Sequence, residues 1–198
     1  MAKERSSDYA DVIEFAGILA FMREPFDSHG DKVAQRVSKM CVAMNVPKTD
    51  AQLIVVGAHL HDVGKLLTQS DLVNMNRKLT ISEIADMQNH TNLGWEAVRR
   101  AGYHQIIQDI VHHHHEAWDG SGYPIGLQDE LIPLAARIVG ICDVYEALTA
   151  RRPYRPAYSH EVAKSIMQTL RGTGFEPRLV DIFFEKVAIE QELEETVE

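Results

Sequence analysis

The chain has 198 residues, of which 45% are hydrophobic and 25% charged, a composition that suits one globular domain with its own core. The net charge of −9 argues against a general attraction to DNA or to an anionic membrane, although a local cationic pocket could still hold a small phosphate ligand. Cys41 and Cys142 lie in apolar runs without CxxC spacing, and the apolar stretch Phe15–Met22 is too short to span a bilayer. We therefore expect a cytoplasmic protein that binds neither DNA nor membranes.

Hydrophobic residues recur at helical spacing along nearly the whole chain, and no alternating strand of useful length interrupts them. The expected fold class is therefore all-α. In chain order the predicted helices are 9–23, 28–45, 50–67, 81–89, 92–101, 104–115, 128–150, 159–171 and 177–189. Thr49 and Thr80 each precede a Gln or Glu by three residues, which is the spacing of a capping box. Gly102 and Gly172 follow helices at positions where a left-handed residue is typical.

These elements are expected to form one domain over residues 1–188. Residues 1–27 would supply an N-terminal helix that leads into the domain, and residues 189–198 an acidic tail. Two irregular stretches, Leu67–Thr80 and Glu116–Glu130, directly follow helix ends that are rich in histidine. Loops beside clustered ligands are where a binding site would open.

The sharpest local motif is HLHDVGKLL, which places His61 and Asp62 side by side on a predicted helix. An imidazole and a carboxylate can each bind a metal ion, and a carboxylate can bridge two ions through its two oxygens. Lys65 lies one turn further along the face of His61, where its ammonium group could contact a substrate phosphate. A surface His-Asp pair with a lysine ion pair is the simpler interpretation of this motif taken alone.

Further candidate ligands are spread along the chain. Asp143 lies in an apolar run, where burial of an unpaired carboxylate is costly, so it needs either a cationic partner or a metal ion. The four helical residues His112–His115 point about 100° apart, so at most two or three of them can face one site. Their place in a continuous helical pattern excludes an affinity tag, and a solvated run at a helix end is the alternative. His29 begins one predicted helix and His90 ends another, where capping or surface roles are the alternative.

Together these motifs resemble the HD-GYP family, the branch of the HD phosphohydrolase superfamily that hydrolyses cyclic dinucleotides. The match runs from about Ser28 to Phe184 and includes HDVGK, HHEAWDGSGYPIGL, DVYEALTARRPYR and GTGFEPRLVDIF in that order. The combination is specific, because HHE, WDGSGYP and RPYR would have to coincide with correctly spaced helices by chance. The resemblance implies an HD-domain helical bundle with extra C-terminal helices and the GYP loop.

The resemblance also implies two divalent metal ions, iron or manganese, that share seven ligands. The expected ligands of one ion are His29, His61 and Asp143. Those of the second ion are His90, His114 and His115. Asp62 would bridge the two ions. Helical geometry alone also allows a His112/His115 pair, so the choice of His114 and His115 rests on the resemblance. Pro25 stands where some family members place a glutamate for a third metal, which favours two ions.

The family pattern assigns further roles in catalysis and in binding of substrate. Asp62 and Lys65 are the expected catalytic residues. The expected substrate-binding residues are Lys65, Tyr123, Arg152 and Arg155. Tyr123 belongs to the GYP signature, Gly122–Pro124, for which a structural turn is the alternative role. The alternative for the two arginines of RPYR is solvent-exposed charge.

The function that the resemblance implies is a metal-dependent phosphodiesterase that hydrolyses cyclic di-GMP to linear pGpG, with further cleavage to GMP as an option. The alternatives are a hydrolase of cyclic GMP-AMP or of another phosphoester, and an inactive domain that binds a cyclic dinucleotide or a partner. Thr68-Gln69 and Met75–Arg77 depart from the usual family residues in the loop over the site, which bears on substrate preference. Such domains are usually joined to a receiver or other sensor, for which the short N-terminal segment leaves no room. A signalling protein is the second partner that we consider.

Overall fold

The computed structural model describes residues 29–68, 80–151 and 156–188. Features of the sequence that lie outside the described residues are the predicted helix 9–23, the loop departures at 69–77, Arg152, Arg155 and the acidic tail. The α-helices are α2 (His29–Ala43), α3 (Lys48–Leu60), α4 (Ile81–Gln88), α5 (His90–Arg100), α6 (Gln105–His113), α7 (Leu134–Thr149), α8 (His160–Thr169) and α9 (Pro177–Lys186). Two short 3-10 helices lie between them, η1 (Val63–Leu66) and η3 (Asp129–Leu131).

Helices account for nearly all regular structure in these ranges. The only β pairing among the described residues is two isolated bridges, Asp119 with Gln128 and Arg171 with Phe175. The expected all-α class is therefore confirmed. None of the helices in the described parts has both the length and the apolar character that crossing a bilayer requires. The expected domain boundaries stay a prediction.

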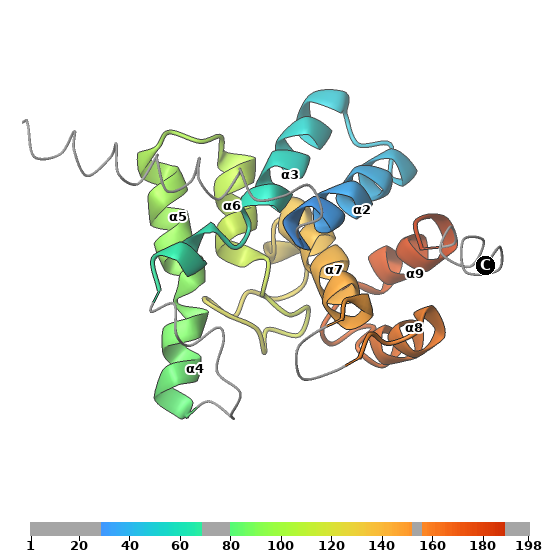
Figure 1. The fold of residues 1–198 in the computed structure, drawn as a ribbon. Coiled ribbons are helices and arrows are strands. Elements are labelled where there is room, and N and C mark those ends of the chain that lie inside the picture. Colours follow the sequence, from blue (N-terminus) through green and yellow to red (C-terminus); the bar gives the residue numbers. More distant parts are fainter. Residues whose placement is uncertain (1–28, 69–79, 152–155, 189–198) are drawn as a thin grey trace, which may run out of the picture.

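The long helix α7 is the centre of the bundle. Figure 1 shows it between α5 and α6 on one side and α8 and α9 on the other, with α2 and α3 across the top. It is apolar on nearly every side and buries residues throughout, from Ala136 to Glu146, as expected of a helix with neighbours all round. Val33, Val37 and Met40 of α2 recur at helical spacing and join it in the main core. Burial of each such side chain contributes about 1.5–3 kcal/mol.

The predicted helix 50–67 is divided in the structure. Helix α3 ends at Leu60, His61 and Asp62 form a turn, and η1 follows. Gly64 lies so close to α5 that a Cβ atom there would collide with the carbonyl oxygen of His90. The chain therefore leaves the helix at the HD dipeptide and approaches the backbone of α5.

Other local predictions have mixed outcomes. The predicted helix 128–150 is interrupted, because α7 begins only after Pro133, which has no N–H to continue a helix from η3. The capping box at Thr80 is confirmed, but the one at Thr49 is wrong, because α3 begins at Lys48 and its start has no side-chain cap. Gly102 and Gly172 have the expected positive φ, 73° and 87°.

Candidate metal centre

The seven predicted ligands come from distant parts of the chain and meet in two groups. The first group comprises His29, His61 and Asp143. The second comprises Asp62, His90, His114 and His115. Within each group every residue offers one donor atom, and these atoms all lie within 4.8 Å of one another. The structure therefore brings all seven residues together and divides the histidines and Asp143 as the resemblance implied, with Asp62, the expected bridge, in the second group. Their binding of metal stays a prediction.

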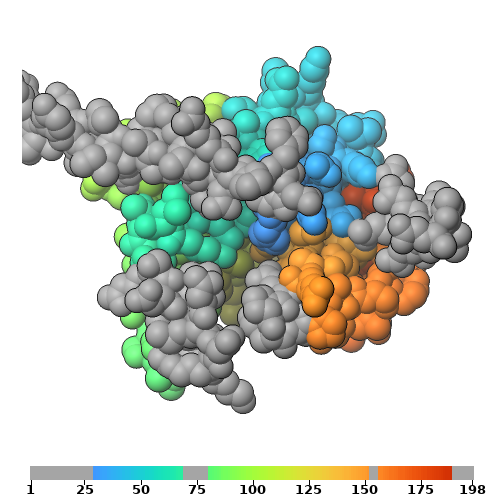
Figure 2. Space-filling model, in the orientation of Figure 1, coloured from blue at the N-terminus to red at the C-terminus, as the bar shows by residue number. Residues whose placement is uncertain are grey.

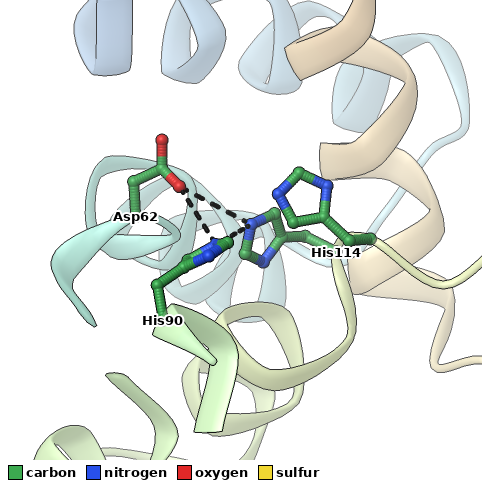
Figure 3. Close-up of side chains that lie close together, drawn as sticks. Asp62, His90 and His114 are labelled. Carbon is green, nitrogen blue, oxygen red and sulfur yellow. Dashed lines mark hydrogen bonds and ion pairs between the residues drawn. The ribbon is translucent and has the colours of Figure 1, made fainter. Parts of the chain in front are cut away.

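Asp62 lies between the two groups. Its Oδ1 atom is 3.4 Å from Nε2 of His90 and 3.8 Å from Nε2 of His114, as the dashed lines of Figure 3 indicate. Its Oδ2 atom is 3.3 Å from Nε2 of His61, on the side of the first group. Each oxygen thus faces a different group, which is the arrangement that a bridging carboxylate requires.

Three of the histidines are oriented by backbone carbonyl groups three or four residues earlier in the chain. The Nδ1 atoms of His61 and His90 each lie 2.7 Å from a carbonyl oxygen, that of Ala58 and that of Met87. Nδ1 of His114 lies 3.0 Å from the carbonyl oxygen of Ile110. A carbonyl can only accept, so Nδ1 donates in each pair and Nε2 is presented to the centre. Such support of the second ring nitrogen is typical of metal-binding histidines.

Burial favours the neutral form of two histidines of the second group, His90 and His115. Burial lowers the pKa of His90 to about 4 and that of His115 to about 2. Burial alone would raise the pKa of Asp62, but the positive charges of His61 and Lys65 outweigh it and hold that pKa well below its usual range. At neutral pH His90 and His115 are therefore unprotonated and Asp62 is ionised, and these are the forms that bind metals.

In the first group, His61 is protonated at neutral pH. Burial lowers the pKa of His61, but the carboxylates of Asp62 and Asp143 outweigh this effect and raise the pKa to about 10. Nε2 of His29 lies 2.8 Å from Oδ1 of Asp143. Burial alone would raise the pKa of Asp143, but the hydrogen bond from His29 and the positive charge of His61 hold it well below its usual range. Asp143 therefore has the partner that its apolar surroundings demanded, and this partner is histidine rather than arginine.

Buried atoms without hydrogen bonds mark where ions would fit. Among the described residues, Nε2 of His61, Oδ1 of Asp62 and Nδ1 of His29 are buried and make no hydrogen bond. Leaving such atoms without a hydrogen bond costs about 1–3 kcal/mol each, and all three belong to predicted ligands. Imidazole and carboxylate donors without thiolate suit iron, manganese or zinc. The residues present thus fit two divalent ions.

The remaining histidines of the HHHH run have other contacts. The ring of His112 stacks on Trp95 with centroids 4.7 Å apart, and its Nε2 atom lies 3.1 Å from Oδ1 of Asn92. Nδ1 of His113 lies 3.5 Å from Oε1 of Glu116. Neither histidine belongs to a ligand group. The His112/His115 pair that helical geometry allowed is therefore not formed.

The GYP loop is held under the second group by a carboxylate. Glu116 accepts hydrogen bonds from the backbone N–H groups of Ile125, Gly126 and Leu127, at 2.9 to 3.1 Å. A Cβ atom at Gly122 would collide with the backbone of Ala117, which explains the glycine of the signature. The ring of Tyr123 packs against His115, with centroids 4.8 Å apart. This packing favours the structural role of the loop, and contact of Tyr123 with substrate stays a prediction.

A cavity of about 1150 Å³ opens beside the ligands. It is lined mainly by α2 and α7, whose surfaces adjoin on the face seen in Figure 2. Lys65 lines it and also forms an ion pair with Asp62, Nζ to Oδ2 2.5 Å, so both interpretations of this lysine have structural support. Five cationic side chains line the cavity: Lys32, Arg36, Lys39, Lys65 and Arg151. The lining also contains three carboxylates, those of Asp62, Asp143 and Glu146, so the five cations leave a small excess of positive charge. This local excess contrasts with the net charge of −9 and suits an anionic ligand.

Two lining residues were missed by the sequence analysis, Arg36 and Glu146. They form an ion pair across the cavity wall, with Nε of Arg36 2.8 Å from Oε2 of Glu146. The available signal was a second acid in the apolar run of α7, one helical turn after Asp143. Nothing in the spacing of α2 indicated which basic residue would meet it.

Comparisons with known proteins agree with this geometry. A family model described as "HD domain" matches residues 15–179. A cyclic di-GMP phosphodiesterase of Vibrio cholerae is 40% identical over 139 residues, 67% of this chain and 28% of that protein. A 3'3'-cGAMP-specific phosphodiesterase of the same organism is 34% identical over 160 residues, 80% of this chain and 31% of that protein. The chain thus spans less than a third of the length of these two relatives.

A solved structure supports the fold alone. It is a HDG"Y"P protein from Bdellovibrio bacteriovorus, with a TM-score of 0.65, 21% sequence identity, and coverage of 78% of this chain and 50% of that chain. The helical bundle is therefore a known architecture.

Proposed function

Because this chain belongs to the HD domain family, in its HD-GYP branch, we propose that it is a metal-dependent phosphodiesterase that hydrolyses cyclic di-GMP. The expected product is linear pGpG, with GMP as the product of a second cleavage. The observation that carries the proposal is the position of Asp62, whose two carboxylate oxygens face two separate groups of histidines. A carboxylate so placed can hold two ions close enough to act on one phosphodiester.

The residues of the two groups would bind the metal ions, and Lys65 would bind the phosphate. His29, His61 and Asp143 would hold one ion, and His90, His114 and His115 the other, with Asp62 shared. A pair of bound divalent ions activates water and neutralises charge on a phosphodiester. Lys65 would move from Asp62 to a phosphate oxygen, since its ammonium already lines the cavity. The ordered rings of His61, His90 and His114 need no rearrangement to present Nε2.

The decisive experiment is anaerobic incubation of the protein with cyclic di-GMP after loading with ferrous iron and, in parallel, with manganese. Product is followed by chromatography. We expect a linear dinucleotide with at least one of these metals, and a loss of activity of at least about a thousandfold in Asp62→Ala, because both ions lose a ligand. Asp50→Ala, a change in the first turn of α3 and outside the cavity lining, is the matched control and should retain activity. Full activity of Asp62→Ala would exclude the bridging role.

Cyclic GMP-AMP is the second candidate substrate. The observation that favours it is the 34% identity to a 3'3'-cGAMP-specific relative, which covers more of this chain than the match to the cyclic di-GMP phosphodiesterase does. Competition between the two dinucleotides at equal concentrations in one reaction separates the candidates, because the ratio of the initial rates then equals the ratio of the kcat/KM values. Binding of either dinucleotide without any product, with both metals, would indicate an inactive sensor domain instead.

A further inference from the structure

Helices α2 and α7 are joined by two successive polar contacts along one edge of the cavity. The first is the contact of His29 with Asp143, which belongs to the ligand groups. The second joins Arg36 to Glu146, one turn further along α7. The backbone of Arg36 lies two turns after that of His29, about 10.5 Å along the axis of α2. Long side chains of a helix lean toward its N-terminus, which is the direction of His29. The guanidinium of Arg36 is thereby brought back toward the ligands.

Arg36 is held in place from two sides. Its guanidinium carbon lies 4.6 Å from the ring centre of Tyr145, a cation–π contact. The phenol of Tyr145 is fixed in turn, because its oxygen lies 2.8 Å from Nδ1 of His160 in the core. The bond from Nε to Glu146 uses one of the five N–H donors of the guanidinium. The two terminal nitrogens carry the other four.

Stability alone is a weak reason for this arrangement. The side chains of Arg36 and Glu146 are 15% and 5% exposed, so both charges are largely removed from water. The desolvation cost of such a pair commonly offsets its Coulomb attraction, and apolar residues of similar size are often as stable. A cation that is already ordered and partly desolvated loses little entropy on binding an anion, which is an advantage in a binding site.

We propose that Arg36 binds the second phosphate of the substrate, the one that is not being cleaved. This inference rests on the proposed function, because a cyclic dinucleotide carries two phosphodiesters and only one of them can lie at the ligand groups. The other must be neutralised elsewhere in the same cavity. Arg36 lies in the cavity wall, with Lys32 on the preceding turn of α2. The planar guanidinium group of Arg36 can donate two parallel hydrogen bonds to two phosphate oxygens. Glu146 and Tyr145 act as positioning residues.

The test compares two substrates in Arg36→Gln. One is cyclic di-GMP, and the other is bis(p-nitrophenyl) phosphate, which has a single phosphodiester. We expect kcat/KM for the dinucleotide to fall about tenfold to a hundredfold, the usual loss for a charged hydrogen bond. This loss should exceed the loss for the single diester by at least about tenfold. Equal losses for the two substrates would overturn the proposal, because a structural role of Arg36 affects both.

Binding provides a readout that does not depend on turnover. Titration calorimetry of cyclic di-GMP into the full chain in the presence of EDTA should give a Kd about tenfold weaker for Arg36→Gln than for the natural protein. The matched control is Arg171→Gln, which breaks an arginine–carboxylate pair with Asp181 outside the cavity lining and should change neither Kd nor kcat/KM. An unchanged Kd in Arg36→Gln would also overturn the proposal.

Further variants separate folding from binding. If thermal melting shows that Arg36→Gln is unfolded, Arg36→Lys replaces it, because lysine keeps the charge but lacks the planar guanidinium group. Its kcat/KM for the dinucleotide, relative to that for the single diester, should fall less, by about threefold to tenfold. No selective loss in a folded Arg36→Lys would then count against the proposal. Failure of the proposed function is recognised in the natural protein alone. If it binds dinucleotide without cleaving it, the Kd ratio still decides the role of Arg36. If it neither binds nor cleaves the dinucleotide when loaded with iron or with manganese, both ideas are wrong.

Discussion

The two ligand groups differ in how ready they are to receive an ion. In the second group, His90 and His114 are buried and ordered by backbone carbonyls, and burial keeps His90 neutral. In the first group, the side chain of His29 is 33% exposed and its Nε2 is engaged with Asp143, while His61 holds a proton at neutral pH. One half of the centre is therefore preformed, whereas the other must exchange protons and hydrogen bonds for its ion.

Removal of a ligand from each half tests this difference most strongly. His90→Ala should abolish the tighter of two manganese-binding steps, and His29→Ala should abolish only the weaker step. Both variants should lower kcat/KM for the dinucleotide by at least about a hundredfold, because two ions are needed for the reaction. Calorimetric titration of the full chain with manganese measures the steps. The reverse assignment of the steps would show that the second group is not the preformed one.

The pH dependence of metal binding sharpens the comparison. The pKa of His61 is raised to about 10 in the folded chain from 6.5, so its proton stabilises the metal-free protein fully below pH 6.5, and this stabilisation is lost as the pH rises through 10. An ion in the first group must displace that proton, so its affinity should rise nearly tenfold per pH unit between pH 7 and 8.5. The second group should show little change, since the pKa of His90 is about 4. Manganese titrations at three pH values measure both steps, and identical slopes would contradict the division.

The hydrogen bonds from the GYP loop to Glu116, called the clamp below, allow the two groups to be compared through a residue that is not a predicted ligand. Glu116→Gln removes the charge that three backbone N–H groups share, and it should lower the free energy of unfolding by about 1–3 kcal/mol. The clamp lies next to His115, so the second group should lose more manganese affinity than the first. Denaturant melts and metal titrations of the same variant provide the two measurements. Glu130→Gln, on the exposed 3-10 helix η3, is the control.

The smallest effect is expected at His112, which neighbours the second group without belonging to it. His112→Ala removes a ring stacked on Trp95 and should lower the free energy of unfolding by about 0.5–1.5 kcal/mol. Metal affinity and kcat/KM should change less than about twofold. A loss of one equivalent of manganese in this variant would show that the run of histidines supplies a ligand from its beginning.

Much of the molecule followed from sequence patterns, because helical periodicity and motif order are local properties. The predicted ligands His114 and His115 could be chosen over a His112/His115 pair only through the family resemblance, since helical geometry alone allows both pairs. The turn at His61 was missed, because it depends on contact between Gly64 and a helix about 30 residues away. The pair of Arg36 with Glu146 was missed for the same reason, since the crossing of α2 and α7 is a tertiary property.

The approach of Gly64 to α5 bears on transfer of this centre to other proteins. Two backbone segments of the chain touch there. The spacing between the turn at His61 and Asp62 and the start of α5 at His90 is therefore set by backbone contact. A protein engineer who grafted only the seven side chains onto another helical scaffold would lose that spacing. The transferable unit is a pair of touching segments, residues 61–64 and 90–94, to which the other ligands can be added from neighbouring helices.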